Sequence, residues 1–260
     1  MTRNLENDMT NHVPAWLAKW HRTLAPCHKV LFTFDLDGTV WPDILSVSSE
    51  HFGSVDPDGV KRWRRIEHAY KVAGTMSNGD HLEALFADIF ERHTMNDMIE
   101  WLQKTHRLLP NFKRFLKLLE MFNVSPVGIS NGASQIASRM LTFHGIEMPV
   151  IANPLAFDKD GKFTGMDFVH DREEGVRKGL MVKAARDMGY RVIGCAGDSK
   201  GDIDMADETL KVPGTVVISY DKGILNDWCK ARTSDADRCL NITDWARAEL
   251  FVTKRLQALR

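Results

Sequence analysis

The sequence predicts an α/β protein with a doubly wound parallel sheet and a bundle of helices inserted after the first strand. After Pro110, short apolar runs alternate with helical segments, a pattern typical of β-α-β units and parallel sheets. Between residues 42 and 107, apolar residues instead recur every three or four positions, as in helices alone. Ligands of parallel sheets bind beyond the carboxyl ends of the strands, so polar residues there are the functional candidates.

The expected elements follow one another without repeats or low-complexity segments. The patterns predict a first helix at 16–24, a first strand at 30–34, helices of the insertion at 60–70, 82–89 and 95–102, then helix 112–122, strand 126–130, helix 133–144, strand 150–152, a hairpin turn at 158–161, helix 179–188, strand 191–196 and strand 216–218. The chain is thereby divided into an N-terminal helical extension (1–28), an α/β core (29–41 and 108–233), a helical cap (42–107) and a C-terminal helical segment (234–260).

The composition is that of a globular protein without a strong charge bias. Apolar residues make up 43% of the chain, and 34 basic residues nearly balance 35 acidic ones. This balance disfavours nucleic acid and anionic membranes as partners. No apolar run approaches the roughly 20 residues that span a bilayer, and the first residues lack a signal-peptide core. The four cysteines lack the spacing of a metal site or disulfide framework, so a cytoplasmic location is expected.

The most informative segment is Asp35-Leu36-Asp37-Gly38-Thr39, which follows the apolar strand 30–34. If strand geometry persists to Asp37, the two carboxylates leave the backbone on the same side and repel each other. A divalent cation such as Mg²⁺ would compensate this repulsion, with one carboxylate free to react. The alternative is a simple Asp-Gly turn at the end of a strand.

A second acidic cluster follows the strand 191–196. Asp198 and Asp202 are four residues apart around a glycine-containing loop, so both can face one cation. The alternative is a helix start whose acidic residues complement the dipole. Two such clusters at the ends of two strands make the turn explanation of the first much weaker.

Two further features point to an anionic ligand. Ser130-Asn131-Gly132 stands where a strand is expected to turn into a helix, and backbone N–H groups there can bind an anion, although Ser and Asn also serve as helix caps. Lys178 stands at the start of a predicted helix, where a cation opposes the helix dipole. A bound phosphate would compensate for this unfavourable position. Together with the acidic clusters, these residues suit phosphoryl transfer, in which charge is neutralised and a nucleophile is held in line.

In this combination the chain resembles the haloacid dehalogenase (HAD) superfamily in its phosphatase branch. The resemblance rests on Asp35 to Thr39, on Ser130 after a strand, on Lys178 and on Gly197 to Asp202, in that order. It implies a Rossmann-like core, with Asp35 as nucleophile and Asp37 as general acid and base. It also implies that Asp35, the backbone carbonyl of Asp37 and Asp198 hold Mg²⁺, that Asp202 supports them, and that Ser130 and Lys178 bind the phosphoryl oxygens.

The insertion at 42–107 resembles the small four-helix cap of phosphoserine phosphatases. Two departures separate the chain from them: they usually carry Ser at the position of Gly38, and Gly at that of Asn131. Glu50 lies where some relatives bind an amino group and is the candidate for substrate contact in the cap. Three functions are therefore considered. These are a Mg²⁺-dependent hydrolase of a small phosphorylated metabolite, a phosphotransferase using the same aspartyl-phosphate, and a non-catalytic binding module on this fold.

Overall fold

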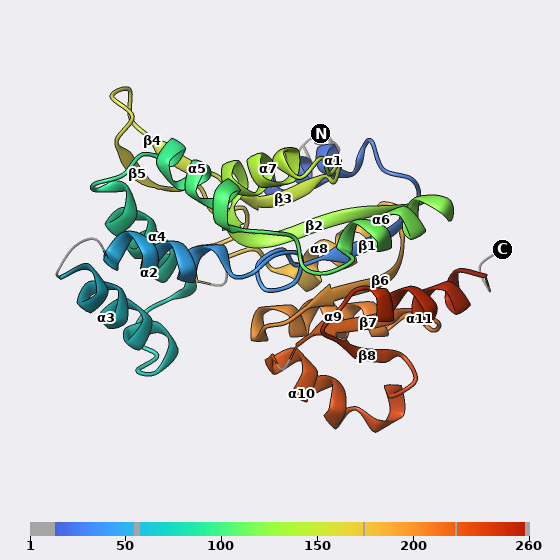
Figure 1. The fold of residues 1–260 in the computed structure, drawn as a ribbon. Helices are drawn as coiled ribbons and strands as arrows, with labels where there is room; N and C mark the ends of the chain where they lie inside the picture. The colour runs from blue at the N-terminus through green and yellow to red at the C-terminus, as the bar shows by residue number, and fades with distance from the viewer. Residues whose placement is uncertain (1–13, 55–57, 174, 222, 258–260) are drawn as a thin grey trace, which may run out of the picture.

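The computed structural model describes residues 14–54, 58–173, 175–221 and 223–257. Its core is a six-stranded sheet in the order β3-β2-β1-β6-β7-β8, in which every neighbouring pair is parallel (Figure 1). The strands are β1 (Val30–Phe34), β2 (Val124–Ala133), β3 (Val150–Asn153), β6 (Arg191–Gly197), β7 (Val216–Tyr220) and β8 (Cys239–Ile242). The predicted doubly wound α/β class is confirmed.

Helices cover both faces of this sheet. One face packs against α6 (Phe112–Met121), α7 (Ser134–Phe143) and α11 (Ala246–Gln257), and the other against α1 (Ala15–Leu24), α8 (Lys178–Asp187), α9 (Ile203–Leu210) and α10 (Ile224–Ala231). Strand β1 shows why, because its side chains alternate between the two faces. Phe32 and Phe34 enter the first layer, whereas Leu31 enters the second, and all three are fully buried.

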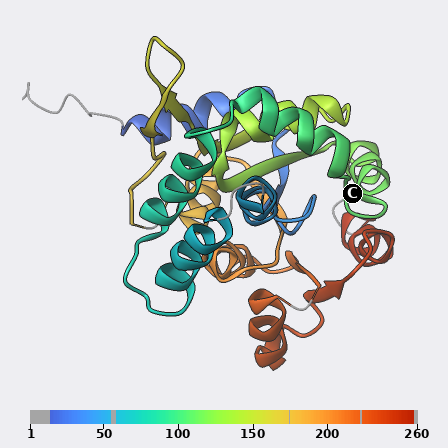
Figure 2. The ribbon, with the colours of Figure 1, turned by 60° about the vertical axis from the view of Figure 1, so that its left-hand side comes forward.

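Four helices lie between β1 and α6, beyond one end of the sheet (Figures 1 and 2). They are α2 (Ile44–Ser54), α3 (Gly59–Lys71), α4 (Asn78–Phe90) and α5 (Met95–Thr105). Ser77 caps α4 by accepting a hydrogen bond from the Asp80 N–H, and Thr94 forms a capping box with Asp97 at α5. The apolar spacing indicated α3, α4 and α5 but not α2, which carries small and polar residues between its apolar ones.

A two-stranded antiparallel hairpin, β4 (Leu155–Phe157) and β5 (Phe163–Met166), lies against α4. The predicted turn occurs at Asp158–Gly161, and Gly161 has the left-handed φ of 79° that the turn requires. Phe157 and Phe163 pack against Phe90 of α4 with ring centroids 5.5 and 5.6 Å away. The hairpin is thus joined to the inserted helices by aromatic contacts.

The C-terminal segment departs from the expectation of helix alone. Residues 234–260 also supply β8, which pairs with β7 and forms the edge of the sheet. Its four residues are too few for a clear two-residue periodicity, so tertiary pairing decides their structure. Main-chain hydrogen bonds join β7 to this segment. The Val217 N–H donates to the Arg238 carbonyl at 2.9 Å, and the Asp221 N–H donates to the Ile242 carbonyl at 2.7 Å.

None of the helices in the described ranges is long and apolar enough to cross a membrane.

Helix α1 is anchored to the core by Trp20, which is fully buried and donates from Nε1 to the Met181 carbonyl at 2.8 Å. Trp20→Ala is expected to lower the free energy of unfolding by about 3–5 kcal/mol, because it leaves a cavity and removes a buried hydrogen bond. Urea unfolding measures this. Arg22→Ala, at an exposed position of the same helix, is the control and is expected to change it by less than about 0.5 kcal/mol. A loss below about 1 kcal/mol for Trp20→Ala would mean that α1 is not anchored in this way.

Candidate active site

The acidic segments meet because β1 and β6 are neighbours in the sheet. Phe34 pairs with Ala196, and the Asp35 N–H donates to the Ala196 carbonyl at 2.8 Å. Asp35 therefore lies beside the loop that follows β6. Asp35, Asp198 and Asp202 each offer a carboxylate oxygen, and these oxygens lie within 4.8 Å of one another. Three carboxylates this close repel strongly unless positive charge compensates them.

Lys178, at the start of α8, supplies part of that charge. Its ammonium group donates to Asp35 Oδ1 at 2.6 Å and to Asp202 Oδ1 at 2.5 Å. Only 2% of Lys178 is exposed, so these contacts are shielded from water. Burial by itself would lower the pKa of Lys178, but Asp202 and Asp35 outweigh that effect and hold the pKa above its ordinary value. Lys178 is therefore a permanent cation between two carboxylates.

Asp202 has a second task in building the loop. Its Oδ2 accepts hydrogen bonds from the backbone N–H groups of Asp198 and Ser199 and from Ser199 Oγ, at 2.8–3.0 Å. These bonds cap the short 3₁₀ helix η1 (Lys200–Asp202). The carboxylate packs against Gly197, where a Cβ atom would lie 2.4 Å from Asp202 Cγ. Only glycine fits at that position, and Asp202 fixes where Asp198 stands.

Burial shifts the pKa values of Asp35 and Asp198. Burial and the nearby Asp202 raise the pKa of Asp35 well above its ordinary value, and Lys178 opposes this shift. The same two causes raise the pKa of Asp198 to about 6. Carboxyl groups with shifted pKa values are typical of sites that bind a cation or catalyse a reaction.

The carboxylate of Asp37 does not belong to this acidic group. Strand β1 ends at Phe34, so strand geometry does not persist to Asp37, although Asp35 and Asp37 line the same cavity. Asp37 Oδ1 accepts hydrogen bonds from Trp41 Nε1 at 2.9 Å and from the Ile44 N–H at 3.3 Å. Burial, followed by the charge of Asp43, raises the pKa of Asp37 to about 7. At neutral pH this group can give or take a proton, as an acid-base residue must.

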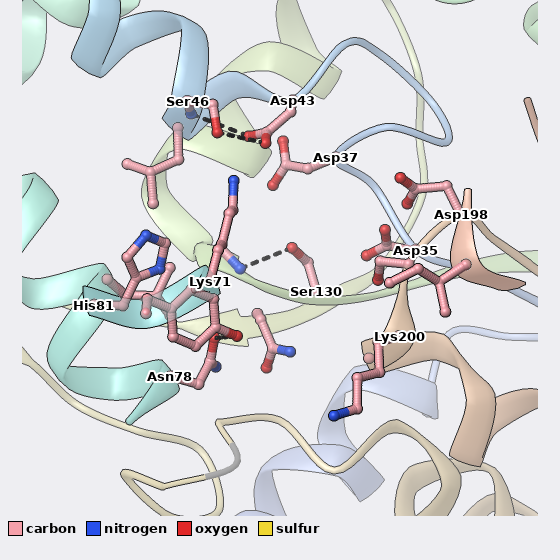
Figure 3. A pocket seen from close by; sticks show the side chains of 18 of the residues that line it. Asp35, Asp37, Asp43, Ser46, Lys71, Asn78, His81, Ser130, Asp198 and Lys200 are labelled. Carbon is pink, nitrogen blue, oxygen red and sulfur yellow. Dashed lines mark hydrogen bonds between the residues drawn. The ribbon is translucent and has the colours of Figure 1, made fainter. Parts of the chain in front are cut away.

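Ser130 and its neighbours stand at the end of β2, beside β1. The expected turn into a helix comes later, because β2 continues to Ala133 and α7 begins at Ser134. The Gly132 N–H donates to Ser130 Oγ at 2.9 Å, which leaves the Ser130 hydroxyl proton free to donate (Figure 3). Asn131 turns its side chain towards the Val176 N–H, at 2.5 Å.

A cavity of about 640 Å³ opens above these residues, between the sheet edge and the inserted helices. Figure 3 shows Asp35, Asp198 and Ser130 on its core side and Lys71, Asn78 and His81 on its helical side. Seven predicted site residues and the neighbouring Ser199 line this cavity. The seven are Asp35, Asp37, Ser130, Asn131, Gly132, Lys178 and Asp198. Asp202 lies buried behind them, in contact with Lys178.

Glu50 is not brought to this cavity. It is exposed on α2, and the residues that line the cavity do not include it. Other residues of the insertion take that place, and the sequence pattern did not single them out: Asp43, Leu45, Ser46, Tyr70, Lys71, Asn78, His81 and Leu82. They cluster at the start of α2, the end of α3 and the start of α4. The ends of the inserted helices were therefore the feature of the sequence that could have identified them.

The sequence matches no protein-family model and no curated protein. Solved structures match its fold. A structure described as a phospho-aspartyl intermediate analogue of phosphoserine phosphatase has a TM-score of 0.59 and 18% identity, and the match covers 84% of this chain and 95% of that one. A phosphoserine phosphohydrolase-like protein from Francisella tularensis has a TM-score of 0.58 and 17% identity, covering 85% and 97%.

A HAD family hydrolase from Salmonella enterica serovar Typhi is also similar, with a TM-score of 0.56 and 13% identity over 78% of this chain and 65% of that one. At such identities the comparison concerns the fold. The chain therefore shares its fold with solved structures described as phosphoserine phosphatase and as a HAD family hydrolase.

Proposed function

We propose that the protein is a Mg²⁺-dependent hydrolase of a small phosphate monoester that reacts through an aspartyl-phosphate on Asp35. The observation that carries this proposal is the position of Lys178, which bridges Asp35 and Asp202 at the floor of an open cavity. A binding module would gain nothing from a buried carboxylate that faces the ligand, whereas a phosphatase needs one as nucleophile.

The oxygen donors of Asp35, Asp198 and Asp202 suit a hard cation, and their mutual repulsion gives a reason for one to bind. We assign Mg²⁺ to this cluster, with the backbone carbonyl of Asp37 as a further ligand implied by the family resemblance. When bound, the cation would supply positive charge that keeps Asp35 ionised and offsets the charge of the phosphoryl group.

We assign the chemical steps to four side chains of the protein. The Asp35 carboxylate attacks phosphorus, and the bond to the leaving oxygen breaks as the new bond forms. Asp37, whose pKa is about 7, gives a proton to that oxygen and later takes one from the water that hydrolyses the aspartyl-phosphate. The Ser130 hydroxyl and Lys178 hold the phosphoryl oxygens during both steps. The carboxyl end of β1 thus carries the reacting groups.

Removal of the metal tests this proposal. With p-nitrophenyl phosphate as substrate, we expect release of inorganic phosphate in the presence of MgCl₂, loss of at least about 99% of the rate with excess EDTA, and recovery when Mg²⁺ is restored. A rate that is unaffected by EDTA would contradict the metal assignment, and no phosphate release from a panel of small phosphate esters would contradict hydrolysis. Added alcohols distinguish a phosphotransferase, because transfer would yield new phosphate esters.

A further inference from the structure

The side-chain amide of Asn131 is held in place inside the cavity. Its Oδ1 accepts a hydrogen bond from the Val176 N–H at 2.5 Å, and its backbone carbonyl accepts one from Asn153 Nδ2 at 2.8 Å. Asn153 is itself fully buried and accepts the Val169 N–H at 3.0 Å through Oδ1. Asn131 thus links the end of β2 to the segment that leads to Lys178.

These contacts fix which atom of the amide faces the cavity. A backbone N–H can only donate, so the atom turned to Val176 must be the oxygen and not the nitrogen. Gly175 packs directly against this oxygen, since a Cβ atom there would lie 2.5 Å from Asn131 Oδ1, and its φ is 73°. The nitrogen Nδ2 therefore points away from this segment.

Nδ2 faces the loop that carries Asp198. A Cβ atom on Gly201 would be 3.7 Å from it, and Gly201, Asp198 and Asn131 all line the same cavity. In the described part of the chain Nδ2 has no hydrogen-bond acceptor, because the hydrogen bonds of Asn131 use only its side-chain oxygen and its backbone carbonyl. A donor held rigid and left without an acceptor at the wall of a binding cavity is suited to an oxygen of the ligand.

We infer that Asn131 Nδ2 donates a hydrogen bond to an oxygen of the bound phosphate ester, and that the Val176 N–H and Gly175 set its orientation. This inference rests on the proposed function. It assigns a substrate contact to the side chain of Asn131, at the position where phosphoserine phosphatases usually carry Gly. The ligand oxygens concerned are anionic, so the hydrogen bond is charge-assisted and its loss is costly.

The variant Asn131→Asp separates the two atoms of the amide. It keeps an oxygen that can accept the Val176 N–H, but it replaces the donor by a negatively charged oxygen. We expect KM for p-nitrophenyl phosphate to rise by about tenfold or more, with a smaller change in kcat. The Kd of inorganic phosphate, measured by calorimetry with MgCl₂ present, is expected to rise by a similar factor. The control is Asn96→Asp, which adds the same charge at an exposed position of α5 and should leave both constants unchanged.

Values of KM and Kd within threefold of the wild type for Asn131→Asp would overturn the inference, and so would a fall in kcat alone. Because phosphate binding is measured without turnover, an inactive wild-type protein would contradict the proposed function and still leave this contact decided. Asn131→Ala removes the acceptor as well and is expected to lower both kcat and Tm. If that variant does not fold, Asn131→Asp still gives the answer.

Discussion

Asp35→Asn is expected to abolish Mg²⁺-dependent phosphate release, with kcat reduced by a factor of about 10⁴ or more. The amide is nearly the same size as the carboxylate but cannot attack phosphorus to form the acyl phosphate. The fold is expected to survive, because the substitution removes one of three repelling carboxylates while Lys178 keeps its contact with Asp202. Phosphate release from p-nitrophenyl phosphate measures the activity, and thermal unfolding measures the stability.

The same variant tests the covalent intermediate. Wild-type protein that is quenched in acid during turnover should carry the mass of one phosphoryl group, and Asp35→Asn should carry none. Asp187→Asn is the matched control, because Asp187 is exposed on α8, where it forms an ion pair with Lys183. Undiminished turnover by a folded Asp35→Asn protein would remove Asp35 as the nucleophile. A phosphorylated Asp35→Asn protein would place the nucleophile elsewhere.

Lys178→Met is expected to lower both the stability and the activity of the protein. In metal-free protein at neutral pH, we expect the free energy of unfolding to fall by about 3–5 kcal/mol, because Asp35 and Asp202 lose the buried cation that both contact. Activity should fall at the same time, since a phosphoryl ligand is lost. Chemical unfolding with EDTA present measures the first effect. Lys183→Met is the control, because its ion pair with Asp187 is exposed and contributes less than about 0.5 kcal/mol.

The loss caused by Lys178→Met should depend on pH in a defined direction. Without Lys178, the pKa of Asp35 rises further above its unfolded value, because the positive charge that lowers it is gone. A carboxyl group with a raised pKa destabilises the folded state when it is ionised and ceases to do so when it is protonated. The deficit should therefore be complete above the folded pKa of Asp35 and shrink as the pH falls through it. A deficit that is the same at all pH values would mean that lost packing, and not charge, is its cause.

The sequence predicted the core of the molecule well because local pattern and tertiary structure agree there. The run Val30–Phe34 forms β1 as expected, and the carboxylates of Asp35 and Asp198 meet because the strands that precede them pair side by side. Buried parallel strands are continuous apolar runs, which are visible without a structure. The polar residues that interrupt such runs at their carboxyl ends are equally visible.

The failures have physical causes of a different kind. Residues Cys239–Ile242 become a strand because β7 offers them an unpaired edge, which is information that their own four side chains do not contain. The Asp37 carboxylate lies outside the group formed by Asp35 and Asp198, because the backbone leaves strand geometry after Phe34 and Trp41 donates a hydrogen bond to Asp37. The position of Glu50 in the chain predicts a substrate contact, but the rotation of α2 leaves this residue exposed.

The amino-acid sequence by itself determined the fold class, the order of the elements and the chemical types of the reacting groups, because these depend on periodicity and on residues adjacent to strands. Only the tertiary structure decided which inserted residues face the cavity, that Lys178 lies between Asp35 and Asp202, and which atom of the Asn131 amide is free. These depend on contacts between segments that are distant in the chain, and on the rotation of helices about their axes. Local sequence patterns do not specify either.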